Sequence, residues 1–354
     1  MTAAYTRERH IAELAVLQAS ILTKRVQSTV SEIHKDDNSP VTIADFAAQA
    51  LLIGALHAAF PNDNFLGEEG SAALKADEAL KNKVYELVLS ANMAHLDSDG
   101  ATFPNPTSVD EMLDLIDLGG CGTGGDKGRV WIMDPIDGTE AFLKGQQYAI
   151  SLALIEDGKE LVGVLGCPNI SAEMTRVSEG NIDQDGLGIM LTAVRAQGST
   201  IRTMTRSGLE DAIPLTILEP SCYNKLHIVD CAASTTCRHD VIAEFAHMFK
   251  ATFPNTEVWS SHIRYAALIV GGGDVQFWVP ASLASKIHVW DHAGAQLIFT
   301  ELGGMVTDLD GKDIDFGAGR DLNRNRGLVV ARGEIHTTVF KAMSKILERK
   351  KEKA

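Results

Sequence analysis

The chain has 354 residues, of which 45% are hydrophobic, and its formal net charge is −15, from 32 basic and 47 acidic side chains. This length and composition favour one large domain or two closely joined lobes around a packed core. A chain this acidic argues against nucleic acid as a partner. It should also repel a phosphorylated substrate unless bound cations reverse the charge locally.

The cysteines and the apolar stretches bear on where the chain works. The five cysteines include no CxxC pair, which favours reduced thiols in a cytoplasmic protein. The first ten residues lack the apolar core of a signal peptide. Polar residues interrupt every apolar stretch well before 18 positions, so we expect no membrane span.

Residues 1–169 are predicted to form an N-terminal α+β lobe. Apolar residues at helical spacing predict helices over residues 8–30, 41–60, 75–95 and 111–118. Strands are predicted at residues 64–69, 148–156 and 161–167, the last two joined by Asp157-Gly158 as a hairpin. We therefore expect helices packed on a largely antiparallel sheet.

A glycine-rich segment spans residues 119–128. Residues 120–125 formally match GxGxxG, the phosphate loop of nicotinamide-dependent oxidoreductases. That loop needs a strand before it and a helix after it, whereas here a helical pattern precedes it. We interpret the segment as a flexible hairpin loop.

The stretch from Trp131 to Thr139 concentrates several candidate metal- and anion-binding groups. Trp131-Ile-Met133 is typical of a buried strand, which we expect to stop at Pro135. The turn would aim the carboxylates of Asp134 and Asp137 and the Ile136 carbonyl at one point, a donor set that suits Mg²⁺. The Gly138 and Thr139 amides, at a possible helix start, suit an anion. An Asp-rich turn that binds nothing is the alternative.

Residues 170–354 are predicted to form a C-terminal α/β lobe. Strands are predicted at residues 188–194, 225–229, 256–259, 275–279 and 327–331. Helices are predicted at residues 241–250, 264–270, 288–302 and 337–353. This alternation is typical of α/β folds, and the absence of a low-complexity linker predicts a substantial interface between the lobes.

Other acidic residues lie at predicted element ends. Glu68 and Glu69 end a strand, and Asp291 begins a helix, where it could simply be an N-cap. Asp45 lies near the start of the second helix, where it could simply interact with the helix dipole. Strand ends and helix starts are also where α/β proteins assemble sites from distant segments.

These motifs resemble the lithium-sensitive, Mg²⁺-dependent phosphomonoesterases that include inositol monophosphatase, fructose-1,6-bisphosphatase and 3′(2′),5′-bisphosphate nucleotidase. Three motifs carry the resemblance, in the family's order: Gly67-Glu68-Glu69, Asp134-Pro-Ile-Asp-Gly-Thr139 and Trp290-Asp291-His292-Ala-Gly294. Matches at residues 38–42, 142–148, 165–169 and 301–304 point to the bisphosphate nucleotidase branch. The resemblance spans about residues 10–345 and implies a layered αβαβα sugar-phosphatase-like fold.

The resemblance also implies a role for each acidic residue. Glu68, Asp134 and the Ile136 carbonyl would hold a first Mg²⁺, and Asp134, Asp137 and Asp291 a second. A third, weaker ion would lie near Glu68 and Glu69. Most of these ligands belong to the N-terminal lobe, and Asp291 comes from the C-terminal lobe.

The resemblance assigns catalysis and recognition to further residues. Asp45 would orient the Thr139 hydroxyl toward the attacking water, and the amides of Gly138 and Thr139 would bind the phosphate. The substrate-binding positions would be Ser234, Ser261, Arg264 and His288. The implied substrate is 3′-phosphoadenosine 5′-phosphate, cleaved to AMP.

The chain departs from the nucleotidase pattern on the substrate side. Glu140-Ala141 replaces Lys-Gly, Ala233 replaces a histidine, and Arg264 replaces a lysine. Before Trp290, Lys286-Ile-His288-Val289 replaces Arg-Glu-Lys-Ile. The alternatives are therefore a diverged phosphatase for another nucleotide, an inositol phosphate or a sugar phosphate, or a non-catalytic nucleotide sensor. The sequence leaves open whether the protein is a monomer or a homodimer.

Overall fold

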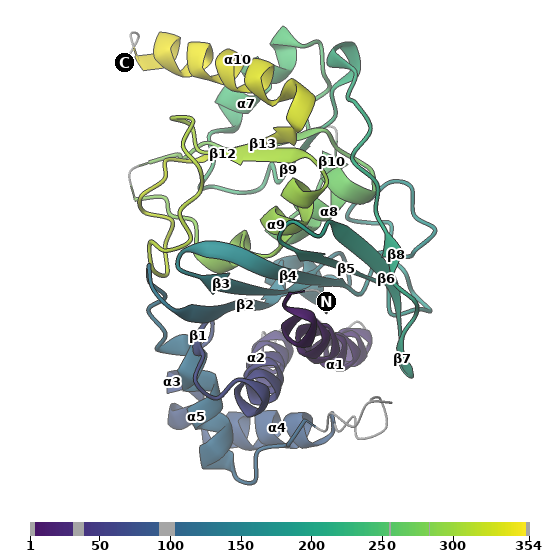
Figure 1. The fold of residues 1–354 in the computed structure, drawn as a ribbon, viewed down its shortest axis with the longest axis vertical. Coiled ribbons are helices and arrows are strands. Elements are labelled where there is room, and N and C mark those ends of the chain that lie inside the picture. The colour runs from purple at the N-terminus through teal and green to yellow at the C-terminus, as the bar shows by residue number, and fades with distance from the viewer. Residues whose placement is uncertain (1–3, 31–38, 92–102, 255, 283, 352–354) are drawn as a thin grey trace.

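The structure, a computed structural model, describes residues 4–30, 39–91, 103–254, 256–282 and 284–351. Helices and sheets alternate in layers (Figure 1). One group of helices covers the outer face of a first sheet, two helices lie between that sheet and a second one, and two more cover the second sheet's far face. This is the αβαβα arrangement that the resemblance implies, so the predicted fold class is confirmed.

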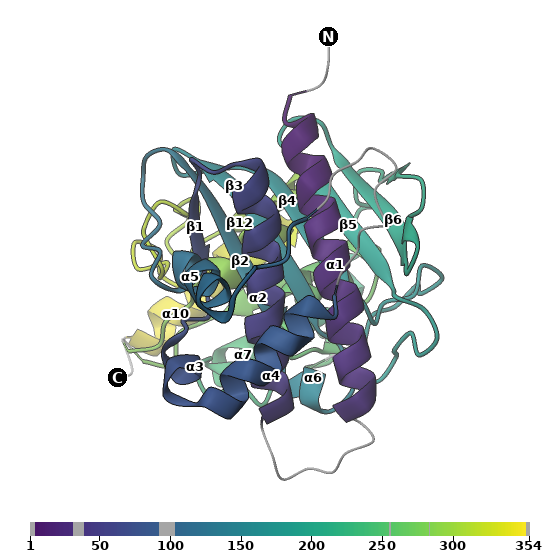
Figure 2. The same ribbon diagram turned by 90° about the horizontal axis from the view of Figure 1, so that it is seen from below.

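The outer helical layer comes from the first 120 residues. Its members are α1 (Thr6–Val30), α2 (Ser39–Ala59), α3 (Ala72–Ala76), α4 (Glu78–Leu89) and α5 (Val109–Gly120). The long helices α1 and α2 run side by side across the first sheet (Figure 2), confirming two predicted helices.

The helix predicted over residues 75–95 is divided. Asp77 is extended, and its carboxylate accepts hydrogen bonds from the N–H groups of Ala79 and Leu80. These bonds cap the N-terminus of α4. Asp77 thus separates α3, which ends at Ala76, from α4, which begins at Glu78. The last part of that prediction, residues 92–95, lies outside the described residues.

The first sheet is mostly antiparallel, as predicted. Its strands are β1 (Asn64–Gly67), β2 (Arg129–Asp137), β3 (Ala149–Glu156), β4 (Lys159–Cys167), β5 (Ile189–Val194), β6 (Ser199–Thr205), β7 (Gly208–Leu209) and β8 (Ile213–Pro214). They follow the order β1-β2-β3-β4-β5-β6-β7, with β8 paired to β6, and β1 alone is parallel to its neighbour. The β3–β4 hairpin at Asp157-Gly158 is confirmed.

This sheet extends past the expected lobe boundary at residue 169. Strands β5 to β8 belong to it, so the change from one sheet to the other falls between residues 214 and 228. The nearly continuous apolar run of residues 189–194 is typical of a buried strand in either sheet, and only its pairing with β4 shows which sheet it joins. We propose that a functional division into two lobes lies after β8.

The second sheet has the order β10-β9-β11-β13-β12. Its strands are β9 (Ile228–Asp230), β10 (Thr256–Glu257), β11 (Val275–Trp278), β12 (Gly304–Thr307) and β13 (Leu328–Arg332). The remaining helices are α6 (Thr139–Leu143), α7 (His239–Met248), α8 (Ser261–Val270), α9 (Ala295–Glu301) and α10 (Gly333–Lys351), with 3₁₀ turns η1 (Tyr223–Lys225) and η2 (Val289–Asp291). No described helix is both long and apolar enough to cross a membrane.

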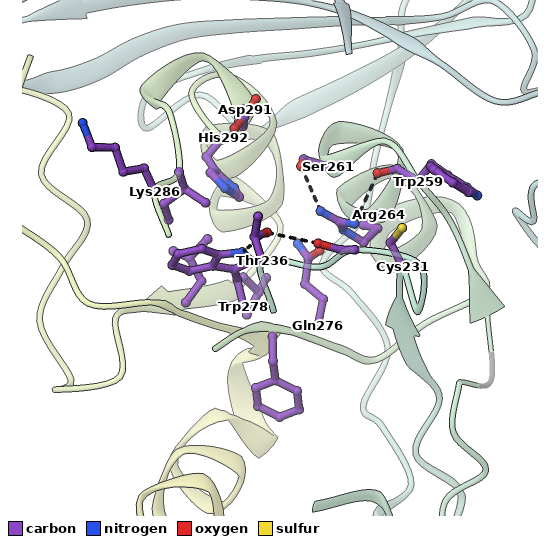
Figure 3. A pocket seen from close by; sticks show the side chains of 15 residues that line it. Cys231, Thr236, Trp259, Ser261, Arg264, Gln276, Trp278, Lys286, Asp291 and His292 are labelled. Carbon is purple, nitrogen blue, oxygen red and sulfur yellow. Dashed lines mark hydrogen bonds between the residues drawn. The ribbon is translucent and has the colours of Figure 1, made fainter. Parts of the chain in front are cut away.

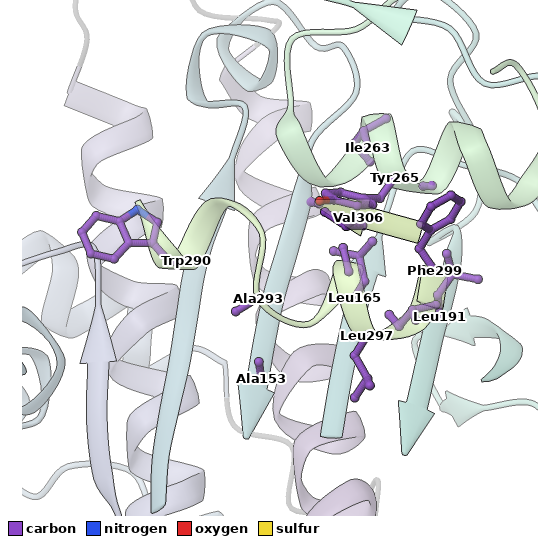
Figure 4. Close-up of a cluster of buried hydrophobic side chains, with 14 of the residues drawn as sticks. Ala153, Leu165, Leu191, Ile263, Tyr265, Trp290, Ala293, Leu297, Phe299 and Val306 are labelled. Atoms are coloured by element: carbon purple, nitrogen blue, oxygen red, sulfur yellow. The ribbon is translucent and has the colours of Figure 1, made fainter. Parts of the chain in front are cut away.

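The core between the sheets holds α8 and α9 in place. Tyr265 of α8 and Phe299 of α9 are fully buried against Leu165 and Leu191 of the first sheet (Figure 4). Val306 of β12 belongs to the same cluster. One continuous apolar core therefore joins both sheets and fixes the elements that carry the candidate site.

The glycine-rich segment is not a hairpin. Gly119 and Gly120 end α5, and the residues after them lead directly into β2. A helix precedes the segment and a strand follows it, which is the reverse of a dinucleotide-binding loop. The segment therefore lacks the structural context of a dinucleotide-binding loop, as the sequence analysis expected.

Candidate active site

A bulge in β2 brings two carboxylates to one face of the first sheet. In a regular strand Asp134 and Asp137, three positions apart, would point to opposite faces. Here Asp134 pairs with Ser151 and Asp137 with Ala149, so three steps along β2 match two along β3. The extra residue turns both aspartates to the same face. The strand thus continues through Pro135, which lies in the bulge, and our prediction that it stops there is wrong.

The end of β1 places Glu68 beside Asp134. Gly67 is opposite Met133 in the parallel register, so Glu68 follows at the level of Asp134. Glu68 and Glu69 come just after the strand, which ends at Gly67 rather than at Glu69 as predicted.

Helix α2 fixes this strand end with a residue that the sequence analysis missed. The Gln49 side chain accepts a hydrogen bond from the Glu69 N–H (2.9 Å) and donates to the Glu69 carbonyl (2.6 Å). Asp45 lies one turn earlier on the same buried side of α2. The i, i+4 spacing from Asp45 to Gln49 was the available signal.

Asp291 reaches the site from the second half of the chain. It ends the 3₁₀ turn η2, and Gly294, with φ 89°, then redirects the chain into α9. The Ser151 hydroxyl donates to the Ala293 carbonyl at 3.0 Å, and a side chain at Gly163 would collide with the Gly294 carbonyl. The turn thus lies directly on β3 and β4, next to Asp134.

Three carboxylates converge as a result. Oxygen atoms of Asp134, Asp137 and Asp291 all lie within 4.8 Å of one another. These are the three side chains that the resemblance assigns to the second Mg²⁺. Ile136 is fully buried in the bulge between the two β2 aspartates, where its carbonyl accepts a hydrogen bond from the Thr139 hydroxyl at 3.2 Å.

The carboxylates are crowded enough to hold protons. Burial, followed by the charge of Glu68, raises the pKa of Asp134 well above its ordinary value. Burial and then the charge of Asp137 raise the pKa of Asp291 to about 7. Loss of solvation, followed by the charges of Glu69 and Asp291, raises the pKa of Glu68 to about 8.

Such a group fits a divalent cation. Carboxylates that repel one another at neutral pH are stabilised by a bound positive charge. Carboxylate and carbonyl oxygens are also the ligands that Mg²⁺ prefers. The donors present therefore match the metal that the resemblance implies.

Asp137 has further partners. It accepts hydrogen bonds from the hydroxyl of Ser260 and from the N–H groups of Ser261 (3.3 Å) and His262 (2.6 Å). These groups form the N-terminus of α8, where a carboxylate is electrostatically favoured. The same bonds join β2 to the helix that carries Arg264.

Asp45 and Thr139 both border the cluster. Burial, with the charges of Glu69 and Glu68, raises the pKa of Asp45 well above its ordinary value. Thr139 is exposed at the start of α6, after Gly138 with φ 91°, which confirms the predicted helix start. Its hydroxyl donates to Ile136, and no hydrogen bond joins it to Asp45 among the described residues. The dyad remains a prediction that requires the hydroxyl to rotate.

A pocket opens beside Asp291. It encloses about 180 Å³ and lies between the second sheet, α8 and the Asp291 turn (Figure 3). Ser234, Ser261 and Arg264, three of the four predicted substrate positions, line it. It therefore joins the predicted recognition residues to a predicted metal ligand.

Arg264 is held in place within this pocket. Its guanidinium donates to the carbonyls of Val258 and Trp259, both at 3.3 Å, and to the Ser261 hydroxyl at 2.8 Å. These bonds leave further donors of the guanidinium for a ligand.

His288, the fourth predicted position, does not line this pocket. Its ring stacks on Trp290 (4.6 Å between centroids), and its Nδ1 lies 2.8 Å from an Asp321 oxygen. The His288 N–H also donates to the Asp291 carboxylate at 3.2 Å. These contacts support the Asp291 turn, and the predicted contact of His288 with substrate stays a prediction.

The sequence analysis missed three pocket residues. The indole of Trp278 lies along the pocket, and its N–H donates to Thr236 at 3.5 Å, whereas the Trp259 carbonyl faces Arg264 and its indole points away from Thr236 and Gln276 (Figure 3). Gln276 is buried, and its amide nitrogen has no hydrogen-bond partner among the residues that the structure describes. Gln276 and Trp278 lie on β11 and Trp259 lies between β10 and α8, in segments without a motif, and these positions were the only signal.

Glu140 has a local counter-charge. Lys144, one turn later on the chain, pairs with it at 3.0 Å. The Lys144 ammonium also lies 4.1 Å from the centre of the Trp259 ring. Together they place a charge pair at the rim of the pocket, so the loss of a cation at position 140 is partly offset.

A second group of possible ligands, Asp230, Cys237 and His239, lies in the second sheet region. Both ring nitrogens of His239 are already engaged, one with Asp230 at 2.7 Å and the other with the Ser234 carbonyl at 2.8 Å. We therefore assign this group to holding the turn that presents Ser234.

The fold matches that of solved inositol monophosphatases. Inositol monophosphatase II of Staphylococcus aureus superposes with a TM-score of 0.60 and 19% identity, covering 97% of each chain. The suhB extragenic suppressor protein of Bartonella henselae gives a TM-score of 0.58 at 16% identity, covering 96% of this chain and 99% of its own. The layered fold thus places the chain in this structural class.

The chain belongs to the inositol monophosphatase family, whose model matches residues 3–348. A 3′(2′),5′-bisphosphate nucleotidase of Emericella nidulans is 37% identical, covering 97% of this chain and 99% of the relative. The nucleotidase of Schizosaccharomyces pombe is 34% identical over 97% of this chain and 96% of its own, and that of Oryza sativa 31% over 99% and 97%. The resemblance found in the sequence is confirmed.

Proposed function

We propose that the protein is a Mg²⁺-dependent phosphomonoesterase that removes the 3′-phosphate of 3′-phosphoadenosine 5′-phosphate to give AMP. The observation that carries this proposal is the convergence of Asp134, Asp137 and Asp291 beside a pocket that contains Arg264. The names of the relatives support the bisphosphate nucleotide as substrate.

The metal-binding residues follow from the cluster. Glu68, Asp134 and the Ile136 carbonyl would hold one ion, Asp134, Asp137 and Asp291 a second, and Glu68 with Glu69 a weaker third. When bound, Mg²⁺ supplies charge neutralisation at the phosphate and lowers the pKa of a coordinated water.

The chain's own residues orient the reaction. Asp45 is buried close to Glu68 and Glu69, and in the proposed dyad it accepts a hydrogen bond from the Thr139 hydroxyl. That hydroxyl then holds the attacking water in line with the phosphorus atom, since phosphoryl transfer depends mainly on positioning and charge stabilisation. The amides of Gly138 and Thr139 bind the phosphate oxygens.

The pocket suits the rest of a nucleotide. The fork of Arg264, with the Ser261 hydroxyl, matches a second phosphate group. The flat apolar ring of Trp278 suits a nucleobase better than the hydroxyl-covered ring of an inositol or a sugar. Ser234 lies on the same wall and would reach the ribose or its phosphate.

A second candidate is an inositol phosphate or another nucleotide. SaIMPase-II, a fold neighbour with a TM-score of 0.54 to 0.57, has been solved with 2′AMP and with inositol monophosphate. A phosphate-release screen over nucleotide bisphosphates, mononucleotides, inositol phosphates and sugar phosphates decides between them. The proposal requires the highest kcat/KM for 3′-phosphoadenosine 5′-phosphate and no release without Mg²⁺. Preference for an inositol phosphate would overturn the nucleotide assignment, and tight binding without release would support a sensor.

Two further properties belong to the proposal. The five cysteines are free in the structure, which is compatible with work in the cytoplasm. Lithium at millimolar concentration is expected to inhibit phosphate release by competing for the carboxylate cluster. A flat lithium dose-response would count against the proposed metal site.

A further inference from the structure

Arg320 joins the segments that carry the metal-binding carboxylates. Its guanidinium donates hydrogen bonds, 2.9 to 3.4 Å long, to the carbonyls of Gly67, Glu68, Gly119, Gly120 and Gly122. Its central carbon also lies 4.6 Å from the centre of the Trp290 ring. No motif considered in the sequence analysis includes this residue.

The contacts with Gly67, Glu68 and Trp290 lie at or next to predicted ligands. Gly67 ends β1 and Glu68 follows it directly, so Arg320 holds the backbone that carries the Glu68 carboxylate. Trp290 precedes Asp291, and the Arg320 carbonyl accepts a hydrogen bond from the N–H of Val289 at 3.0 Å. Arg320 therefore binds the β1 end with its side chain and the Asp291 turn with both its side chain and its backbone.

The glycine-rich segment makes this arrangement possible. A side chain at Gly120 would lie 2.3 Å from the Glu69 carbonyl, and one at Gly122 would lie 1.9 Å from that of Phe65. Only glycine lets this segment lie directly on β1 with its carbonyls turned toward one guanidinium. The segment that formally resembles a dinucleotide loop is thus a carbonyl cradle for a cation of the chain itself.

The contacts require arginine. A guanidinium has five N–H donors in a fixed plane, and its face stacks on an aromatic ring. A lysine ammonium has three donors at one point and could not span the same carbonyls while it contacts Trp290.

We propose that Arg320 is a positioning residue that sets the separation of Glu68 and Asp291, and thereby the affinity of the site for Mg²⁺. The inference rests on the proposed function in one respect, that these carboxylates are metal ligands. Arg320 touches no reacting atom in this account. Groups that orient metal ligands typically change metal affinity or activity by about 10- to 100-fold when they are replaced.

The test is Mg²⁺ titration into the metal-free protein without substrate, by isothermal titration calorimetry. Arg320→Lys keeps the charge, and Arg320→Gln removes it. Arg324→Gln is the matched control. Arg324 lies four residues after Arg320 and also contacts the glycine-rich segment, but through exposed hydrogen bonds to Asp126. We expect both Arg320 variants to bind Mg²⁺ about 10-fold or more weakly, and the control to bind like the wild type.

Activity then separates positioning from chemistry. For the Arg320 variants, phosphate release should need more Mg²⁺ and approach the wild-type kcat once the metal saturates. Unchanged Mg²⁺ affinity in folded Arg320→Gln would overturn the proposal, and so would failure of both variants to fold, which would assign Arg320 to the fold itself. Because calorimetry needs no turnover, a wild-type protein that binds Mg²⁺ but releases no phosphate would refute only the proposed function.

Discussion

At the scale of single residues, the site is a set of acids that the fold forces together. Burial and mutual repulsion raise the pKa values of Asp134, Asp291 and Glu68, the last two to about 7 and about 8. In an unfolded chain these groups titrate near pH 4. The folded protein without metal therefore binds protons that the unfolded chain has already released between about pH 4 and pH 8.

This predicts a characteristic pH dependence of stability. Because the folded-state pKa values are raised, their contribution is fully present below about pH 4 and is lost as the pH rises through 7 to 8. In EDTA, the loss of this contribution should lower the melting temperature as the pH rises from about 4 to 8. Saturating Mg²⁺ should abolish this decrease. The difference between the two melting curves should thus grow with pH. A difference that is constant from pH 5 to pH 8 would contradict the crowded-carboxylate account.

Thr139 offers a second test at this scale. Removing its hydroxyl in Thr139→Ala should lower kcat by about 100-fold or more, as for other groups that handle a reacting proton. Thr139→Ser should keep most of the activity, and both variants should bind Mg²⁺ normally. A Thr139→Ala enzyme with wild-type kcat would remove Thr139 from the mechanism.

At the scale of elements, the site depends on where strands and helices end. The bulge in β2 turns Asp134 and Asp137 to one face, and the N-terminus of α8 binds Asp137 from the other side. Ser260 joins the two roles, since it caps α8 by accepting from the Ile263 N–H at 3.0 Å and donates to Asp137.

Ser260→Ala tests this double role. Loss of an N-cap costs about 1 kcal/mol, so the melting temperature should fall by a few degrees. Ser108→Ala is the control, because Ser108 caps α5 through the Glu111 N–H at 3.1 Å. Both variants should lose similar stability, and Ser260→Ala alone should also weaken Mg²⁺ binding. Equal Mg²⁺ affinity in the two variants would show that Ser260 does not support the metal site.

These elements show what a sequence pattern can reveal. The helical period predicted α1 and α2 to within two residues, and Asp157-Gly158 predicted the β3–β4 hairpin. The bulge was not predictable in this way, because Pro135 is as compatible with a strand end as with a bulge. The contacts of Arg320 depend on backbone carbonyls, which leave no trace in side-chain patterns, whereas Gln49 could be noticed only through its i, i+4 spacing from Asp45.

At the scale of the whole molecule, the two sheets contribute different parts of the site. The first sheet and α2 carry most of the carboxylates, whereas the second sheet and α8 line the pocket. A resemblance carried by three short motifs named carboxylates that the structure brings together, Asp134, Asp137 and Asp291, because all three lie in those motifs. The pocket walls Trp259, Trp278 and Gln276 come from segments without motifs and required the structure.

The pocket side predicts how substrates are distinguished. If Arg264 binds the second phosphate, Arg264→Ala should raise KM for 3′-phosphoadenosine 5′-phosphate by about 10-fold or more, in line with the loss of a charge-assisted hydrogen bond. The KM for a substrate with one phosphate should change little, and Arg264→Lys should be intermediate. Equal effects on both substrates would assign Arg264 to another role.

The central claim is that Asp134, shared by both predicted ions, makes phosphate release depend on Mg²⁺. The most direct measurement is phosphate release from 3′-phosphoadenosine 5′-phosphate across a Mg²⁺ titration, for the wild type, Asp134→Asn and the exposed control Asp313→Asn. Wild type and control should be active only with Mg²⁺, and folded Asp134→Asn should lose about 1,000-fold or more of kcat, as expected when a group on which transition-state charge stabilisation depends is removed. Full activity of Asp134→Asn, or activity of the wild type in EDTA, would contradict the account.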